Sequence, residues 1–210
     1  MKKNGFSILE LLVGLVVAML CMIMMLMTFK QISKVSLESS MDAEYDTQVQ
    51  LGMLVLQKVI QNAGYGSGNA ADILMSNNTL YLRFTPDLAT PTIIKCQALT
   101  SENDIVNKEY KLFLLENTTN CEASTALNSI AWTNSNTIKS PLITIKNKEI
   151  SATTPPIFSF SVQSLPSPKK CTPYGISNAN PSGTKFVTVT AQGQHITQKQ
   201  IQSLICLNNI

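Results

Sequence analysis

The chain has 210 residues, of which 44% are hydrophobic and 14% are charged, so it can bury one sizeable core and is not disordered throughout. Its formal net charge of +3 lacks the basic excess of a nucleic-acid-binding protein, and no nucleic-acid partner is expected. The hydrophobic residues are distributed unevenly along the chain.

An uncharged, strongly apolar run extends from Leu11 to Phe29. Its length is close to the roughly 20 residues that a helix needs to cross a bilayer. A cleaved secretory signal has an apolar region of about 7 to 15 residues followed by a small-x-small cleavage site, whereas this run leads directly into Lys30. The run therefore predicts a retained transmembrane helix. Its orientation is not decided by charge, because Lys2 and Lys3 precede it while Lys30 and Lys34 follow it.

A long helix is predicted from Phe6 to about Asn62, a stretch without proline. In its second half, apolar residues recur every three or four positions while acidic and amide residues occupy the other faces. This apolar stripe consists of Met41, Tyr45, Val49, Met53, Leu56, Ile60 and Ala63. We expect the stripe to pack against a partner, and the helix to stop at residues 64–68, where glycines can adopt positive φ.

Beyond these glycines the hydrophobic period shortens to two, which is typical of strands. Strands are predicted at Thr79–Phe84, Glu109–Leu115, Ile157–Val162, Lys185–Ala191 and Ile201–Leu207. The polar segment Glu116–Ser140 and the proline-bearing segment Leu165–Pro181 are predicted to be loops. An antiparallel β-sheet whose apolar face covers the helix stripe gives a two-layer α+β fold.

The cysteines indicate which side of the membrane holds most of the chain. Cys21 lies within the apolar run, and an even set of four follows it: Cys96, Cys121, Cys171 and Cys206. Such a set is expected to form two disulfides in an oxidising compartment. Three pairings are possible, and we prefer Cys96 with Cys121 and Cys171 with Cys206, each worth roughly 3 to 4 kcal/mol in the chain-entropy model. The bulk of the chain is therefore expected in the periplasm or outside the cell.

Catalytic and metal-binding patterns are not found in the sequence. His195 is the single histidine and is expected to be solvent-exposed, and no cluster of His, Cys and carboxylates has the spacing of zinc ligands. The glycines of 64–68 end a helix rather than follow a strand, so they do not predict a phosphate-binding loop. Residues Ser101–Asp104 lack the alternating ligands of a calcium loop and are interpreted as a solvated turn. We expect no enzyme activity, no cofactor and no metal.

Glu10 is the only acidic residue between Met1 and Glu38 and lies one turn into the predicted membrane helix. A charged side chain costs about 2.5 to 3.5 kcal/mol at the centre of such a helix and less near the interface, so something is expected to compensate it. One interpretation is a capping box with Ser7. The other is an ion pair with the α-amino group of a neighbouring copy. The spacing favours neither, and the two can operate at different stages.

The segment from Lys2 to Val13 resembles the processing motif of type IV prepilins: a short basic leader, Gly5 before the scissile bond, Phe6 after it, and Glu10 at the fifth position of the mature chain. The resemblance implies cleavage between Gly5 and Phe6 by an inner-membrane prepilin peptidase, methylation of the new Phe6 amine, and assembly through Glu10. It also implies a single-pass precursor in the bacterial inner membrane, with its bulk in the periplasm, that later enters a pilus filament or its tip.

A second segment, Leu51–Gly66, is similar to the end of the long helix in PilW-type minor pilins, where an amphipathic helix runs into Ala-Gly-Tyr. The closing segment Ile205–Asn209 resembles their final strand. The chain departs from major pilins at Met27, where they commonly carry a helix-kinking proline, and this puts local melting of the helix there in doubt.

These resemblances imply a minor pilin that contributes to pilus initiation, assembly or the tip. Its expected partners are other major and minor pilins, the prepilin peptidase, the inner-membrane assembly platform and membrane lipid. The alternative is a minor pseudopilin of a type II secretion system, and the Ala63-Gly64-Tyr65 ending of the helix favours the pilus. The expected organisation is a leader at 1–5, the transmembrane half of the helix at 6–29, its amphipathic half at 30–63, and a β-rich extracytoplasmic part at 64–210.

Overall fold

The computed structural model describes residues 7–117, 119, 121–166, 171, 183–194 and 200–210. The predicted leader, Phe6, His195 and most of the predicted loop Leu165–Pro181 lie outside the described residues. The chain divides into two compact units, Met1–Glu44 and Tyr45–Ile210. This division assigns the second half of the long helix, from Tyr45, to the same unit as the β-strands.

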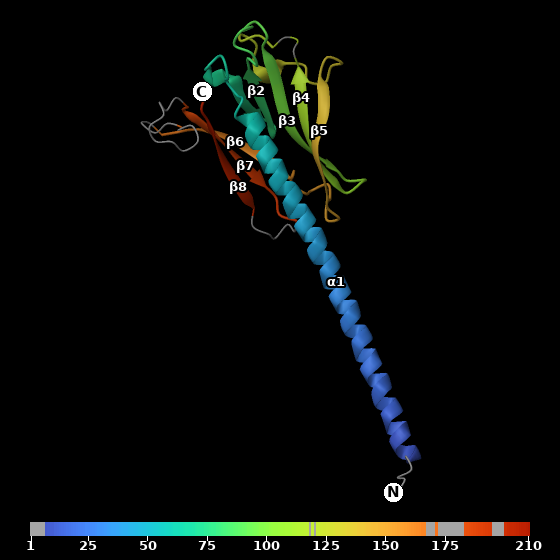
Figure 1. Cartoon of the computed structure of the whole chain (residues 1–210). Coiled ribbons are helices and arrows are strands. Elements are labelled where there is room, and N and C mark those ends of the chain that lie inside the picture. Colours follow the sequence, from blue (N-terminus) through green and yellow to red (C-terminus); the bar gives the residue numbers. More distant parts are fainter. Residues whose placement is uncertain (1–6, 118, 120, 167–170, 172–182, 195–199) are drawn as a thin grey trace. The chain divides into compact units, whose positions relative to one another are not determined.

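A single α-helix, α1, runs from Ile8 to Ile60 (Figure 1). Its bounds lie within two residues of the predicted ones, and no proline interrupts it. Met27 is in regular helix, as are its neighbours on both sides. The first unit consists of this helix up to Glu44, together with the residues that precede it.

Three glycines end the helix as predicted: Gly64, Gly66 and Gly68 all have positive φ, at 71°, 83° and 64°. This left-handed backbone region is open to glycine without steric cost, whereas other residues adopt it at a penalty. The N–H of Gly64 donates to the carbonyl of Arg83 over 2.9 Å, which ties the end of the helix to the sheet. The short 3-10 helix η1 (Ala70–Asp72) then leads into the first strand.

The first sheet has five antiparallel strands in the order of the chain (Figure 1). They are β1 (Ile73–Ser76), β2 (Thr79–Phe84), β3 (Lys95–Asp104), β4 (Glu109–Asn117) and β5 (Ile138–Lys146). A two-residue turn joins β1 to β2, because Asn77 and Asn78 both have positive φ, the arrangement of a type I′ hairpin. The 3-10 helix η2 (Leu127–Ser129) lies in the connection between β4 and β5.

The second sheet has three antiparallel strands, again in chain order: β6 (Phe158–Ser164), β7 (Lys185–Ala191) and β8 (Ile201–Leu207). The predicted α+β fold, a long N-terminal helix packed on antiparallel β-structure, is therefore confirmed. All five predicted strands are present, and β2, β7 and β8 have the predicted bounds. The expectation of one sheet was wrong, because the strands form two.

Three strands were not predicted, namely β1, β3 and β5. The predicted solvated turn Ser101–Asp104 is the end of strand β3, and the turn that follows it lies at 105–108. The end of the predicted loop Glu116–Ser140 also needs correction, because Ile138–Ser140 belongs to β5 and Glu116 to β4. Pro141 is accommodated because β5 is the edge strand of its sheet, next to an irregularity in register at Leu112 and Phe113.

The main core of the second unit combines one face of α1 with both sheets. Tyr45, Val49, Leu56 and Ile60 of the helix, followed by Ala63, are buried there, which confirms these members of the predicted stripe, and Met53 is partly buried against them. Gly52 is also buried, and its lack of a side chain leaves room for Phe158 of β6 and Ile143 of β5.

A second, smaller cluster contains Cys96, Cys121, Leu127 and Ile130, with the rings of Tyr81 and Trp132 partly buried against it. Tyr81 alternates along β2 with Leu80 and Leu82, which belong to the main core, so the smaller cluster lies on the other face of the first sheet. The connection between β4 and β5 supplies Cys121, Leu127, Ile130 and Trp132, and it therefore covers part of that face.

Candidate functional site

The residues predicted to carry function at the N-terminus are only partly described. Gly5 and Phe6 lie outside the described residues. Glu10 lies in the first turn of α1 with its side chain exposed. The N–H groups of Glu10 and Leu11 both donate to the carbonyl of Ser7, over 3.0 and 3.2 Å. These bonds begin the helix through the backbone, and the Glu10 carboxylate makes no hydrogen bond or ion pair with another described residue.

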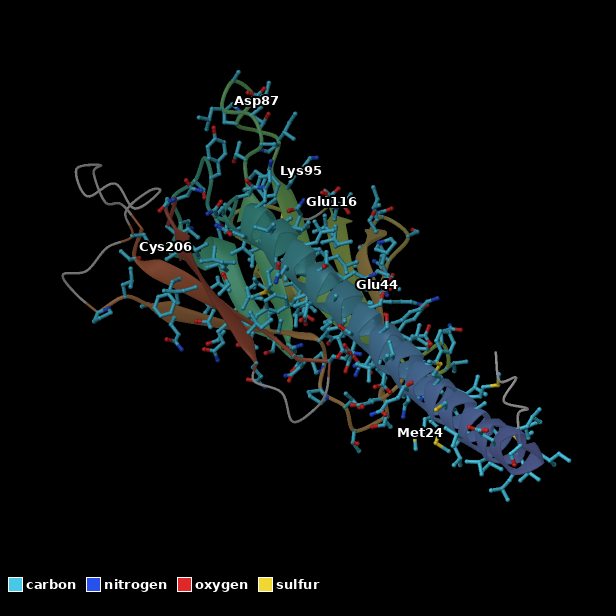
Figure 2. All side chains as sticks on the ribbon, turned by 60° about the horizontal axis from the view of Figure 1, so that its bottom comes forward. Met24, Glu44, Asp87, Lys95, Glu116 and Cys206 are labelled. Atoms are coloured by element: carbon cyan, nitrogen blue, oxygen red, sulfur yellow. A yellow bond between two sulfur atoms is a disulfide. The ribbon has the colours of Figure 1, made fainter. Side chains whose placement is uncertain are left out.

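The first unit exposes an extensive apolar surface. Large hydrophobic side chains from Ile8 to Leu37 are between 47% and 87% exposed, and Figure 2 shows them standing out from the helix around Met24. Within the part of the chain that the structure describes, α1 is the one helix long and apolar enough to cross a membrane. A helix that is apolar on all its faces and uncovered by its own chain requires lipid or other protein around it.

Backbone and hydroxyl groups in this apolar stretch are satisfied within the helix. The hydroxyl of Thr28 donates to the carbonyls of Met24 and Met25, over 3.1 and 2.9 Å. The bilayer interior holds no water to pair with backbone N–H and C=O groups. A helix can cross it because each backbone hydrogen bond closes within the same segment. Cys21 is exposed on the same surface and belongs to neither disulfide.

Charged residues return to the helix at Lys30, which marks the end of the apolar stretch. Lys34 and Glu38 form an ion pair of 3.8 Å with side chains 76% and 63% exposed. A pair this open to solvent contributes at most about 1 kcal/mol. Its main significance is that the helix surface here suits water or a headgroup region rather than hydrocarbon.

Two disulfides cross-link the second unit. Cys96 is joined to Cys121 with a Cα–Cα distance of 5.7 Å, and Cys171 to Cys206 with a distance of 5.6 Å. These are the two pairs that the sequence analysis preferred. The first anchors the β4–β5 connection to strand β3, and the second anchors the segment at Cys171 to strand β8. Disulfides persist in oxidising compartments.

A buried ionic cluster that sequence reasoning missed lies beside the first disulfide. Arg83, the only arginine of the chain, pairs with Asp72 at 3.3 Å, and both side chains are at most 3% exposed. Arg83 also donates to the carbonyls of Ala123, over 3.0 Å, and Thr125, while Asp72 accepts from Ser67. The cluster thus connects the turn after α1, strand β2 and the β4–β5 connection. A single arginine in an otherwise apolar strand is the one signal that could have found it.

A second charged group lies at the turn between β3 and β4. The Lys111 ammonium donates to Asp104 over 2.7 Å, and Asn107 donates to the same carboxylate through its backbone and side chain. These bonds hold the pKa of Asp104 well below its usual range, and the bond to Asp104 raises the pKa of Lys111. Asp104 is the first residue of the turn, and its carboxylate accepts from the backbone N–H of Asn107. This is a structural role.

The described residues contain no group of three or more His, Cys, Asp or Glu side chains placed to hold a metal ion. Comparison with known proteins identifies no relative: no family model, no curated protein and no solved structure matches this chain. The features of the chain that bear on its function are the apolar helix with its single early carboxylate and the disulfide-linked β-rich unit.

Proposed function

We propose that this chain is a minor pilin subunit of a type IV pilus, contributing to initiation, assembly or the tip of the filament. The observation that carries the proposal is the combination of a basic leader, Gly5, Phe6 and Glu10 at the start of a helix whose apolar surface its own chain leaves uncovered. In this proposal, lipid covers that surface in the precursor and neighbouring subunits cover it in the filament.

Glu10 has a specific role in this scheme. Cleavage after Gly5 creates an α-amino group on Phe6, and in a bundle of helices away from bulk water that cation is costly unless it is paired. No other acidic residue precedes Glu38, so Glu10 is the side chain able to neutralise the amine within the same layer. The exposed carboxylate in the first turn of α1 is compatible with a partner from another subunit.

The second unit supports export and exposure on a filament. Its two disulfides suit an oxidising environment, and the buried Arg83 holds the β4–β5 connection against the sheet by donating to the carbonyls of Ala123 and Thr125. The proposed partners are other pilins, the prepilin peptidase, the assembly platform of the inner membrane and lipid. We propose no catalytic role for the chain.

The test compares Glu10→Ala and Glu10→Gln with the parent chain for recovery in sheared filaments, at matched membrane levels. Both variants are expected to insert and be cleaved, because removing a charge makes the span more apolar. Both are expected to be depleted from filaments, since neither side chain can neutralise an amine. Glu38→Gln is the matched control, because it removes the next acidic residue along the helix, and it should be incorporated normally.

Other outcomes separate the alternatives. Normal incorporation of both Glu10 variants contradicts an assembly role for this carboxylate. Rescue by Gln with failure of Ala indicates a capping box, which Gln preserves and whose loss costs about 0.5 to 2 kcal/mol. Loss of protein secretion rather than of pili, on deletion of the gene, assigns the chain to the pseudopilus of a type II secretion system instead.

A further inference from the structure

We propose that the outer face of the first sheet carries a binding site for a neutral saccharide, with Trp132 and Tyr81 as the surfaces against which a sugar ring packs. A hollow of about 440 Å³ lies between this face and the β4–β5 connection. Small-ligand sites typically have volumes of about 300 to 1,000 Å³. The inference uses only the second unit and does not depend on the proposed pilus function.

The first sheet and the β4–β5 connection form the hollow together. Thr79 and Tyr81 come from β2, Thr100 from β3 and Leu115 from β4, all on the face opposite the main core. The connection contributes Trp132, Thr133 and Asn134. The Cys96–Cys121 disulfide and the Arg83 bonds to Ala123 and Thr125 hold this connection in place, so the site is built on cross-linked structure.

The two aromatic rings are fixed by contacts on the side away from solvent. Their centroids are 5.5 Å apart with an interplanar angle of 42°, and both rings are partly buried against the cluster around Cys96 and Cys121. The indole N–H of Trp132 donates to the carbonyl of Leu127 over 3.0 Å. Because these contacts hold the rings, they can offer apolar surface to a ligand without the entropic cost of ordering.

Polar side chains line the hollow around the rings, and those of Thr133 and Asn134 are exposed to solvent. Within the described residues, the hydroxyls of Tyr81 and Thr133 and the side-chain amide of Asn134 take part in no hydrogen bond, although all three residues line the hollow. These groups offer both donors and acceptors. A ligand that places several hydroxyls near an apolar ring face would satisfy them, whereas a purely apolar ligand would leave them unpaired.

The charged residues at the rim favour an uncharged ligand. Lys139 and Glu102 pair at 2.7 Å, and the Lys139 ammonium lies 3.9 Å from the centroid of the Phe113 ring. The Lys139 ammonium is therefore already paired with the Glu102 carboxylate and the Phe113 ring. A charged ligand would find no unpaired opposite charge at this rim. A pyranose ring has the required chemistry, because it combines a C–H face with hydroxyls around its edge and carries no charge.

The single tryptophan of the chain is Trp132, so its fluorescence reports directly on the site. The full-length chain, in a zwitterionic detergent without a sugar headgroup, is titrated with methyl glycosides of glucose, galactose, mannose and N-acetylglucosamine and with their short oligosaccharides. We expect a saturable change with at least one probe, with a Kd on the order of 1 mM. Raising the salt concentration tenfold should change that Kd less than twofold, because no ion pair forms on binding.

Variants distinguish the site from binding elsewhere. The double variant Thr133→Ala with Asn134→Ala removes side chains that make no hydrogen bond within the described chain, so it should fold normally and weaken binding at least tenfold. Asn128→Ala, an exposed residue of the same connection that does not line the hollow, is the matched control and should bind as the parent does. Equal thermal unfolding of the three proteins verifies that the fold is retained.

Three results would overturn the assignment. One is the absence of a saturable fluorescence change with every probe up to about 100 times the expected Kd. Another is binding, detected by ligand-observed NMR, that the double variant does not weaken. The third is attachment to phosphatidylcholine vesicles carrying a galactolipid that soluble saccharides do not compete, which would identify a membrane surface rather than a saccharide as the ligand.

Discussion

The two units use one continuous helix in opposite ways. Up to Glu44 the large apolar side chains of α1 lie on every face and remain uncovered, whereas from Tyr45 one stripe of them is buried against two sheets, and Leu51 and Leu54 outside that stripe are exposed. The backbone is helical throughout. The distribution of apolar residues around the helix therefore decides whether its partners belong to the same chain or have to come from outside it.

The largest expected difference between the units comes from truncating matched leucines. Leu56 is fully buried and Leu20 is 53% exposed. Leu56→Ala should lower the free energy of unfolding of the β-rich unit by about 2 to 5 kcal/mol, because it removes packing and leaves a cavity. Leu20→Ala should leave that quantity unchanged. Urea unfolding of the detergent-solubilised chain, followed by Trp132 fluorescence, measures the free energy of unfolding of both variants. An equal loss in the two would contradict the difference between the buried and the uncovered part of the helix.

Removing the first disulfide should have a comparable or slightly smaller effect. Replacing both Cys96 and Cys121 with Ser opens a loop of 25 positions, which corresponds to roughly 3 to 4 kcal/mol in the chain-entropy model. Cys21→Ser is the control, since Cys21 is exposed in the first unit and forms no disulfide. The same urea titration applies, and an unchanged midpoint for the double variant would show that the cross-link does not stabilise the unit.

Adding one methyl group at Gly52 or at Gly14 compares how tightly the helix is packed in the two units. A Cβ at Gly52 would lie 2.6 Å from Phe158 and 2.7 Å from Ile143, whereas at Gly14 it would meet nothing within 4 Å. Gly52→Ala should therefore cost about 1 to 3 kcal/mol through overpacking, despite its better helix propensity. Gly14→Ala should leave the stability of the β-rich unit as it is. A stabilised Gly52→Ala variant would mean that the helix is less tightly packed on the sheets.

The smallest effect is expected at the exposed turn of Asp104. Its folded-state pKa is depressed, first by the bond from Lys111, so its contribution is present above the unfolded pKa of about 3.9 and is lost as the pH falls below it. Asp104→Asn should therefore lower stability slightly at pH 7, and the difference should shrink as the pH falls from about 4 toward 2. Glu122→Gln, at an exposed position, should show no such dependence. A difference that persists at low pH would indicate that the carboxylate charge is not responsible.

Sequence periodicity predicted the helix and five strands because their patterns are regular over many residues. It missed β3 because Gln97 occupies the inner face of that strand, opposite Leu82, where it donates to Glu116. A polar residue at a buried position breaks the alternation that identifies a strand. It missed β5 because Pro141 is typical of a loop, and only the edge position of the strand makes this proline acceptable.

The candidate sites differ in how far the sequence could predict them. Glu10 is identified from the sequence because its significance depends on its neighbours along the chain. The bonds of Arg83 to Ala123 and Thr125 and the hollow beside Trp132 depend on the β4–β5 connection, which Cys121 holds against the outer face of the sheet. Their residues are far apart in the sequence, and no local pattern indicates that this face is covered.

The central claim is that the first unit is a processed helix that enters a filament. Mass spectrometry of this chain, recovered from sheared filaments of cells with an active prepilin peptidase, tests it most directly. We expect a mature chain that begins at Phe6, carries a methylated α-amino group and retains both disulfides. Recovery of the chain only from membranes, with Met1 and the segment through Gly5 intact, would contradict it.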